Sequence, residues 1–351
     1  MKTPRVLVAF NTLAPCPADK DYSEDFRHPD WQTEADVTSA LGELGCPVEL
    51  AGIFDDTSIL HEKIKTFQPD IIFNLVERFK NNSAHEADFT AFLKLLGVPF
   101  TGCGPEAMML CKDKGLSKQI LSHHRIRVPQ FAIFPVKKQA KRPRWLDFPV
   151  FIKPLKEEAS LGISQASFVE NDAQFKERVE FIHDTMGLDV IAEEYIAGRE
   201  LYVGMAGHQR LEVFPVREMV FARVDDEDPK IATYKAKWDE TYRKKWGIKN
   251  RFAENLGPEI LRPLEKFCKK IYRALCIQGY ARLDLRLRED GQMYFIEANP
   301  NPMLAKDEDF ALSAQKAGLA YPALIQKILN LALADATSSE KVPGTLTNLS
   351  R

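Results

Sequence analysis

The chain has 351 residues, of which 45% are hydrophobic and 28% charged, a globular composition that excludes disordered, collagen-like and disulfide-scaffold proteins. A net charge of −2 gives no global field for nucleic acid or an anionic membrane, so we expect neither as a partner. The six cysteines are scattered, no run approaches the ~20 apolar residues that span a bilayer, and the first residues lack a signal-peptide pattern, so we expect a cytoplasmic enzyme.

The first hundred residues predict alternating strands and helices. Such alternation with short connections is typical of a parallel sheet with helices on its faces, a Rossmann-like α/β domain. No glycine precedes Gly42, so the first turn cannot be Gly-x-Gly-x-x-Gly, and we expect nucleotide to bind elsewhere. The predicted strands are 6–10, 48–54 and 70–75, and the predicted helices are 34–44, 58–67 and 84–96.

The rest of the chain predicts a mixed α+β arrangement. Its basic stretch at 137–144 lies beside a proline, which favours a solvated connector over a nucleic-acid contact. An acidic turn is predicted at 225–228, and a frayed tail over 335–351. The predicted helices are 105–125, 172–186, 258–276, 307–317 and 321–333, and the predicted strands are 128–134, 148–153, 189–194, 200–206, 281–288 and 293–298.

A hairpin between the last two predicted strands carries the sharpest local signal. The Asp-Gly pair at 290–291, flanked by alternating strands, predicts a two-residue type I′ turn. With that turn, Asp284 faces Glu297 and Arg282 faces Asn299. Side chains two residues apart share a face, so all four are expected on one side of the hairpin.

Two opposed carboxylates repel each other unless a positive charge lies between them. Carboxylate and amide oxygens suit Mg²⁺, so Asp284, Glu297 and Asn299 form a candidate magnesium site. The alternative is a solvated polar face on which Arg282 and Arg286 neutralise the acids.

Three further segments carry a resemblance. The stretch at 148–164 resembles the ATP-grasp strand and phosphate loop of D-alanine–D-alanine ligases, 193–200 resembles their adenine hinge, and 282–301 resembles their metal site. The segments 101–105 and 113–114 also match, and the order is that of the family from about residue 70 to residue 305.

The resemblance implies an ATP-grasp fold and an ADP-forming ligase. Residues 1–104 would form a Rossmann-like N-terminal domain, 105–196 a central lid, and 197–334 a C-terminal catalytic domain. Such enzymes phosphorylate a carboxylate and let an amine attack the acyl phosphate, with ATP and Mg²⁺ (or Mn²⁺) as cofactors. The implied ATP-binding residues are Lys114, Lys153, Ser160, Gly162, Glu193, Tyr195, Ile196 and Glu200, the metal ligands are Asp284, Glu297 and Asn299, and the catalytic residues are Arg282 and Lys237.

Departures from the family fall on the substrate side. The segment 11–19 does not match the family's glycine-rich motif, and Ala159, Trp238 and Met303 replace a serine, a tyrosine and a glycine. Glu86 fits a substrate-side acid by position, although an acid at a helix start is an equal alternative. We therefore expect retained ATP chemistry with changed substrates, and a basic stretch at 243–245 suggests an extra anionic group on one of them.

The leading hypothesis is a ligase that couples an amino-acid or peptide carboxylate to an amine. A true D-alanine–D-alanine ligase of cell-wall synthesis is the first alternative, and an inactive ATP-binding regulatory protein is the second. The intact Asp284, Glu297 and Asn299 argue against the inactive protein. The expected partners are small amino-acid or peptide substrates, and a homodimer is one of the assemblies to test.

Overall fold

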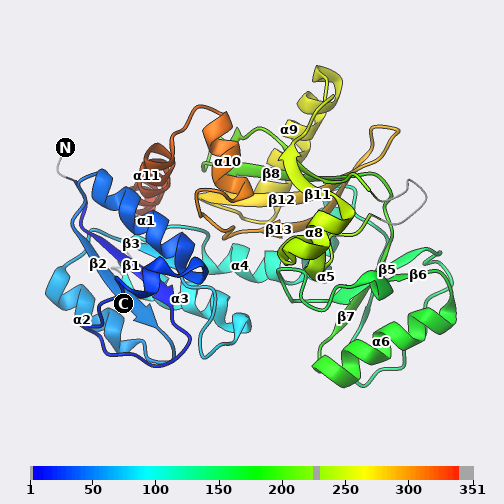
Figure 1. The fold of residues 1–351 in the computed structure, drawn as a ribbon, viewed down its shortest axis with the longest axis horizontal. Coiled ribbons are helices and arrows are strands. Elements are labelled where there is room, and N and C mark those ends of the chain that lie inside the picture. Colours follow the sequence, from blue (N-terminus) through cyan, green and yellow to red (C-terminus); the bar gives the residue numbers. More distant parts are fainter. Residues whose placement is uncertain (1–2, 224–229, 340–351) are drawn as a thin grey trace, which may run out of the picture.

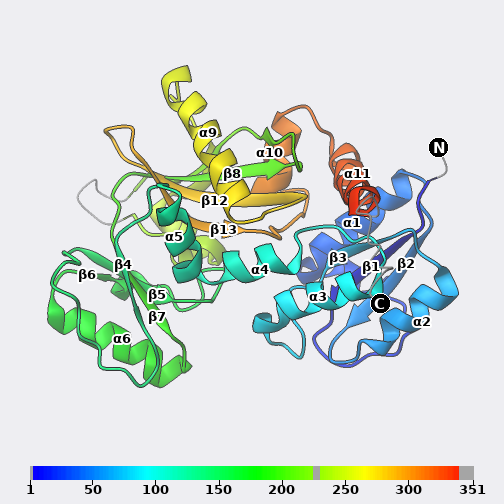
Figure 2. The ribbon, with the colours of Figure 1, turned by 180° about the vertical axis from the view of Figure 1, so that it is seen from behind.

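A computed structural model describes residues 3–223 and 230–339 of the chain. The described residues form three β-sheets, with strands from 6–75, 131–194 and 199–299 (Figure 1). The C-terminal sheet lies between the other two, and the view from behind shows the same order (Figure 2). The predicted acidic turn at 225–228 lies outside the described residues.

The N-terminal sheet is parallel, as predicted, with β1 between β2 and β3. Alternate side chains of β1 enter two different cores, because successive residues of a strand point to opposite faces. Helices α1 and α11 cover the face with Val6 and Val8, and α2 and α3 cover the face with Leu7 and Ala9. The elements are β1 (Val6–Asn11), α1 (Gln32–Glu43), β2 (Val48–Ile53), α2 (Ser58–Phe67), β3 (Ile71–Leu75), α3 (Glu86–Leu96) and α11 (Tyr321–Ser339).

The central sheet has the strand order β4-β7-β5-β6 and is antiparallel. Helix α6 packs on one face through Phe175, Val179 and Ile182. The elements are β4 (Phe131–Phe134), β5 (Val150–Pro154), β6 (Phe168–Val169), α6 (Asp172–Met186) and β7 (Val190–Glu194).

The C-terminal sheet has the order β11-β10-β8-β12-β13, with β9 paired to β8, and all these pairs are antiparallel. The amphipathic helix α9 buries Leu264, Cys268 and Ile271 against it. The elements are β8 (Arg199–Ala206), β9 (Glu212–Val213), β10 (Arg217–Phe221), α7 (Tyr234–Trp238), α8 (Glu240–Trp246), β11 (Ile248–Phe252), α9 (Pro258–Ala274), β12 (Tyr280–Leu287), β13 (Met293–Asn299) and α10 (Asp309–Lys316).

Two segments differ from the sequence prediction. The helix predicted over 105–125 is two helices, α4 (Pro105–Lys112) and α5 (Lys114–His123). Asp113 separates them, because it has an extended backbone and its carboxylate accepts hydrogen bonds from the first turn of α5. Helix α11 continues to Ser339, beyond residue 335 where we expected the tail to begin, and no glycine or proline after Pro322 interrupts it.

Among the described residues, no single helix is long and apolar enough to cross a membrane. Helices α10 and α11 pass that test only as a pair, on length and composition, and they are bent by 101° at their junction.

Candidate active site

Two adjoining cavities lie where the three sheets approach one another. The larger, of about 400 Å³, is bounded by the C-terminal sheet and by acids of the N-terminal domain. The smaller is a slot of about 70 Å³ between the central and C-terminal sheets. Lys237 and Glu297 line both, so the cavities meet at these two side chains. The slot brings together most of the predicted ATP-binding residues: Lys153, Ser160, Glu193, Tyr195, Ile196 and Glu200.

In the hairpin of β12 and β13, Asp284 faces Glu297 as predicted, but the loop that joins the two strands differs from the predicted turn. Its loop has three residues, 289–291, because the Arg288 amide bonds to the Gln292 carbonyl at 2.9 Å. Gly291 has φ +80°, the left-handed conformation that ends such a loop. The predicted two-residue turn is therefore wrong.

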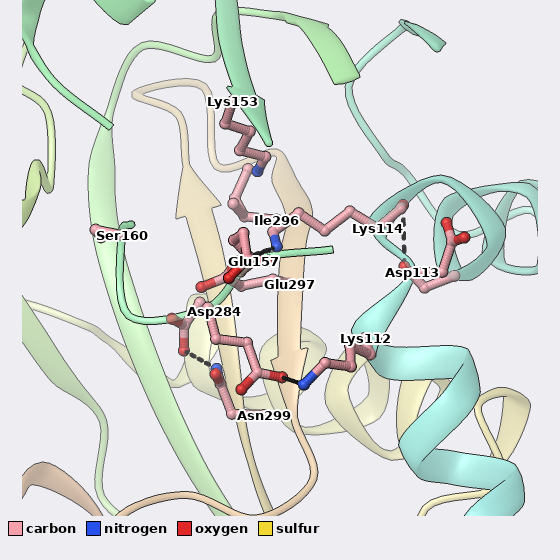
Figure 3. Close-up of polar contacts among 12 residues, drawn as sticks. Lys112, Asp113, Lys114, Lys153, Glu157, Ser160, Asp284, Ile296, Glu297 and Asn299 are labelled. Atoms are coloured by element: carbon pink, nitrogen blue, oxygen red, sulfur yellow. Dashed lines mark hydrogen bonds and ion pairs between the residues drawn. The ribbon is translucent and has the colours of Figure 1, made fainter. Parts of the chain in front are cut away.

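A bulge in β13 restores the predicted register. Leu285 pairs with Phe295, whereas Asp284 pairs with Glu297, so Ile296 is an extra residue in β13. Beyond the bulge, Arg282 pairs with Asn299 as predicted. The candidate metal ligands consequently lie on one face of the hairpin (Figure 3).

The two carboxylates are compensated by different cations. Arg282 donates two hydrogen bonds, of 2.8 and 3.0 Å, to Asp284. The alternative of a polar face predicted this neutralisation by Arg282. Burial raises the pKa of Asp284, and Arg282 opposes that shift. Burial would also raise the pKa of Glu297, but Lys114, at 3.9 Å, and Lys237 outweigh it and hold the pKa at about 2. Glu297 is therefore an anion at any physiological pH.

The third candidate ligand and the second arginine complete the hairpin. Asn299 donates its amide to Asp284 at 3.3 Å, which leaves its amide oxygen for another partner. Arg286 instead pairs with Glu200 at 2.7 Å, so the predicted ribose acceptor is already bound to a cation. No cluster of three or more His, Cys, Asp or Glu suited to a metal occurs in residues 3–223 and 230–339, and the site has two carboxylates and one amide.

Buried lysines converge on the slot from the central sheet and α5. Glu193 lies between Lys153, at 3.0 Å, and Lys118, at 2.9 Å. Burial would raise the pKa of Glu193, but the two lysines lower it. Lys114 donates to the Glu157 carbonyl in the phosphate loop, as Figure 3 shows. This arrangement concentrates positive charge beside the carboxylates of β12 and β13.

The loop after β5, which we predicted to bind phosphate, contains a cluster of positive φ values. Ala159, Ser160 and Gly162 have φ values of +52°, +60° and +72°. A Cβ on Gly162 would lie 2.8 Å from a Pro154 side-chain atom, so both the conformation and the space require glycine. The amides of such a loop form a concave surface that suits anions.

Residues 230–247, which contain α7 and α8, contact this loop. We call them the lid segment, which is distinct from the central lid predicted at 105–196. The Trp238 indole donates to the Ala159 carbonyl at 3.1 Å, and Ser160 donates to the Ala232 carbonyl at 2.8 Å. Lys237 lies on α7 of the same segment and lines both cavities. The two departures at positions 159 and 238 therefore form one contact, in which an indole N–H meets a main-chain carbonyl.

The hinge after β7 closes the other end of the slot. The Tyr195 amide bonds to the Pro149 carbonyl at 3.1 Å, and its ring packs edge-on against Phe168. Within the described part of the chain, the Ile196 amide has no hydrogen-bond partner.

The predicted substrate-side residues line the larger cavity. Glu86 pairs with Lys112 at 3.1 Å, and burial, assisted by Glu158, raises its pKa to about 8. Glu86 is also the first residue of α3, as the alternative of an acid at a helix start predicted, but its side chain pairs with Lys112 and caps no helix amide. Met303 also lines this cavity.

Sequence reasoning missed two buried cations. Arg217 lines the larger cavity, where it pairs with Asp309 at 2.9 Å. Lys118 is fully buried and lies one helical turn after Lys114, a spacing that places both on one face of α5. Of the predicted basic stretch 243–245, only Arg243 lines the cavity.

Comparisons with known proteins point to one family. The family model described as D-ala D-ala ligase C-terminus matches residues 119–330. An uncharacterised protein, y4sG of Sinorhizobium fredii, is 31% identical over 84% of this chain and 86% of its own length. D-alanine–D-alanine ligase B of Chromobacterium violaceum is 26% identical over 84% of this chain and 90% of its own.

Solved structures confirm the predicted ATP-grasp fold. D-alanine–D-alanine ligase from Bacillus anthracis, complexed with ATP, superposes with a TM-score of 0.74 at 18% identity, covering 96% of this chain and all of that one. The VanG D-Ala:D-Ser ligase of Enterococcus faecalis gives a TM-score of 0.67 at 18% identity, covering 94% of this chain and all of that one. These two likenesses concern the fold.

Proposed function

We propose that this chain couples an amino-acid or peptide carboxylate other than that of D-alanine to an amine. The premise is that the chain belongs to the D-alanine–D-alanine ligase family and is therefore an ATP-dependent ligase that forms C–N bonds. The observation that carries the proposal is the contrast between the two cavities. The slot keeps lysines, hinge and carboxylates together, whereas the larger cavity is lined by residues that depart from the family's pattern.

The adenine end of ATP would lie in the slot, at the hinge, and the phosphates would point toward Lys237 and Glu297, where the slot meets the larger cavity. The Ile196 amide, which has no partner among the described residues, would donate to a ring nitrogen, and Glu200, which lines the slot, would accept from the ribose. Lys114 and Lys153 would bind the phosphates, with Glu193 orienting Lys153. The loop at Ser160 and Gly162 would surround the terminal phosphates.

Magnesium fits the donor set of the hairpin. Asp284, Glu297 and the free Asn299 oxygen would hold it, and the ion would neutralise the transferring phosphoryl group. Glu297 stays ionised in this setting, as a metal ligand must.

The reaction would proceed in two steps. A carboxylate oxygen of the donor attacks the γ-phosphorus, the bond to ADP breaks, and an acyl phosphate forms. An uncharged amine then attacks the acyl carbon, loses a proton, and phosphate leaves. Arg282 and Lys237 would stabilise the charge that develops on oxygen, and the support for this is that both line the larger cavity with Glu297.

The donor side has room for more than alanine. A third cavity, of about 410 Å³, adjoins the cavity of about 400 Å³ described above, because Glu77 and Met303 line both. Trp31 and Glu34 line its outer part. Burial, with the charge of Glu77, raises the pKa of Glu34 to about 7. Each of these two cavities already lies within the roughly 300–1000 Å³ of sites for drug-sized ligands, and this favours a dipeptide or a long amino acid as substrate.

One experiment tests the proposal directly. The protein is incubated with ATP, Mg²⁺ and pools of amino acids or short peptides, and phosphate release is measured pool by pool. Release with a pool lacking D-alanine, and its loss in Glu297→Gln, supports the proposal. Abundant D-alanyl-D-alanine from D-alanine alone would establish the first alternative, and ATP binding without release in any pool would establish an inactive protein. We place the reaction in the cytoplasm, where ATP and magnesium are available, and homodimerisation stays a prediction.

A further inference from the structure

Lys118 is a charged side chain in an apolar place. Its relative exposure is 0%, and its ammonium lies 5.4 Å from the centre of the Phe295 ring. A buried ammonium is costly unless it is paired and hydrogen-bonded, so its partners are informative. It has two: the Glu193 carboxylate at 2.9 Å and the main-chain carbonyl of Ile296.

The Ile296 carbonyl belongs to the extra residue of the β13 bulge. Between 285 and 287 the paired positions follow one register, in which Asp284 would face Ile296. Because successive side chains point to opposite faces, that register would turn Glu297 away from Asp284. The bulge therefore places the second carboxylate of the candidate metal site opposite the first.

A bulge leaves one residue outside the regular ladder, so its polar groups need other partners. The Lys118 ammonium supplies one to the carbonyl of that residue. The other lysine of α5, Lys114, donates to the Glu157 carbonyl instead. Among the described residues, Lys118 is therefore the one lysine of α5 that bonds to the main chain of β13. Lys118 thus connects α5, which carries Lys114, with β13, which carries Glu297.

We propose that Lys118 is a positioning residue, which holds the Ile296 bulge of β13 and thereby sets Glu297 opposite Asp284 for the divalent ion. It touches neither substrate nor metal and acts through the main chain. The inference rests on the proposed function only in assuming that the ion binds at this hairpin. Burial lowers the pKa of Lys118 to about 8, against the charge of Glu193, which agrees with a side chain retained for its contacts.

The test measures metal binding without turnover. Mn²⁺ binding in the presence of ADP is followed by electron paramagnetic resonance for the wild type, Lys118→Met and Lys118→Gln. Loss of a partner that orients a metal ligand weakens binding by roughly 10–100-fold, so we expect that loss in Lys118→Met. Lys118→Gln keeps an N–H donor on a shorter side chain, and we expect an intermediate weakening of about threefold to tenfold.

Lys112→Met is the matched control, because Lys112 pairs with Glu86 and Glu158 instead of β13. Its Mn²⁺ affinity should stay within about threefold of the wild type. Unfolding by urea shows which variants fold. If Lys118→Met does not fold, the Mn²⁺ affinity of Lys118→Gln decides the test. Wild-type Mn²⁺ affinity in a folded Lys118 variant overturns the inference alone, whereas a wild type that binds no Mn²⁺ with ADP overturns the proposed metal site and the inference together.

Discussion

The contact between the Trp238 indole and the Ala159 carbonyl tests whether the lid segment helps to hold nucleotide. Trp238→Phe keeps an aromatic ring but removes the N–H donor, together with part of the indole ring system, a loss that Trp246→Phe shares. A hydrogen bond of this kind contributes a net 0.5–1.5 kcal/mol, and Trp238 is 45% exposed, so about 1 kcal/mol is an upper value. That free energy corresponds to about a fivefold shift between closed and open lid.

The assay is the dissociation constant of a non-hydrolysable ATP analogue with Mg²⁺. We expect weakening of about twofold to fivefold in Trp238→Phe, with an unfolding free energy within about 1 kcal/mol of the wild type. Trp246→Phe is the matched control, since Trp246 lies in the same segment and packs against Tyr242 without a hydrogen bond from its indole to any described residue. Equal affinities in the wild type and Trp238→Phe, or equal losses in both variants, would refute the reasoning.

Three further changes probe other parts of the site. Asp284→Asn should lower Mg²⁺-dependent phosphate release by about 100-fold or more while the urea midpoint stays near that of the wild type, and near-native release at low Mg²⁺ would make the hairpin purely structural. Gly162→Ala should lower the unfolding free energy by about 1–3 kcal/mol, read from thermal unfolding, because φ is +72° and its Cβ would meet Pro154; an unchanged midpoint would contradict this. In the folded protein the pKa of Glu86 is about 8, against an ordinary value of 4.5. The free energy of unfolding of the wild type should therefore fall relative to that of Glu86→Gln as the pH rises between these values, by up to about 1.4 kcal/mol per pH unit. A difference that is constant from pH 5 to pH 8 would show that Glu86 is ionised throughout.

The order and type of most elements follow from local patterns. Helix α2 and helix α6 begin and end where the periodicity predicted, because an apolar face repeats at helical spacing up to the polar or glycine residue that ends it. The break at Asp113 was missed, since a single aspartate in a helical pattern gives no sign of whether it caps the next helix. The short helices α7 and α8 were also missed, because their positions depend on contacts with the phosphate loop.

The hairpin shows how a correct pairing can rest on a wrong turn. The three-residue loop shifts the register by one position and the bulge at Ile296 shifts it back, so Asp284 still faces Glu297. Neither shift is visible in the alternation of residues around the Asp-Gly pair. Lys118, which bonds to the bulge, is more than 170 residues away in the chain, and only the folded structure brings the two together.

The last helix of the chain has a consequence for how the protein is made. Helix α11 supplies Leu324, Ile325 and Ile328 to the same core as Val6 and Val8 of the first strand. A ribosome releases the chain from its N-terminus, so the first sheet waits with one apolar face partly uncovered until the final helix emerges. The enzyme's N-terminal domain is therefore completed last, and a chain that stops before α11 would expose that face to aggregation however well the remaining two sheets fold.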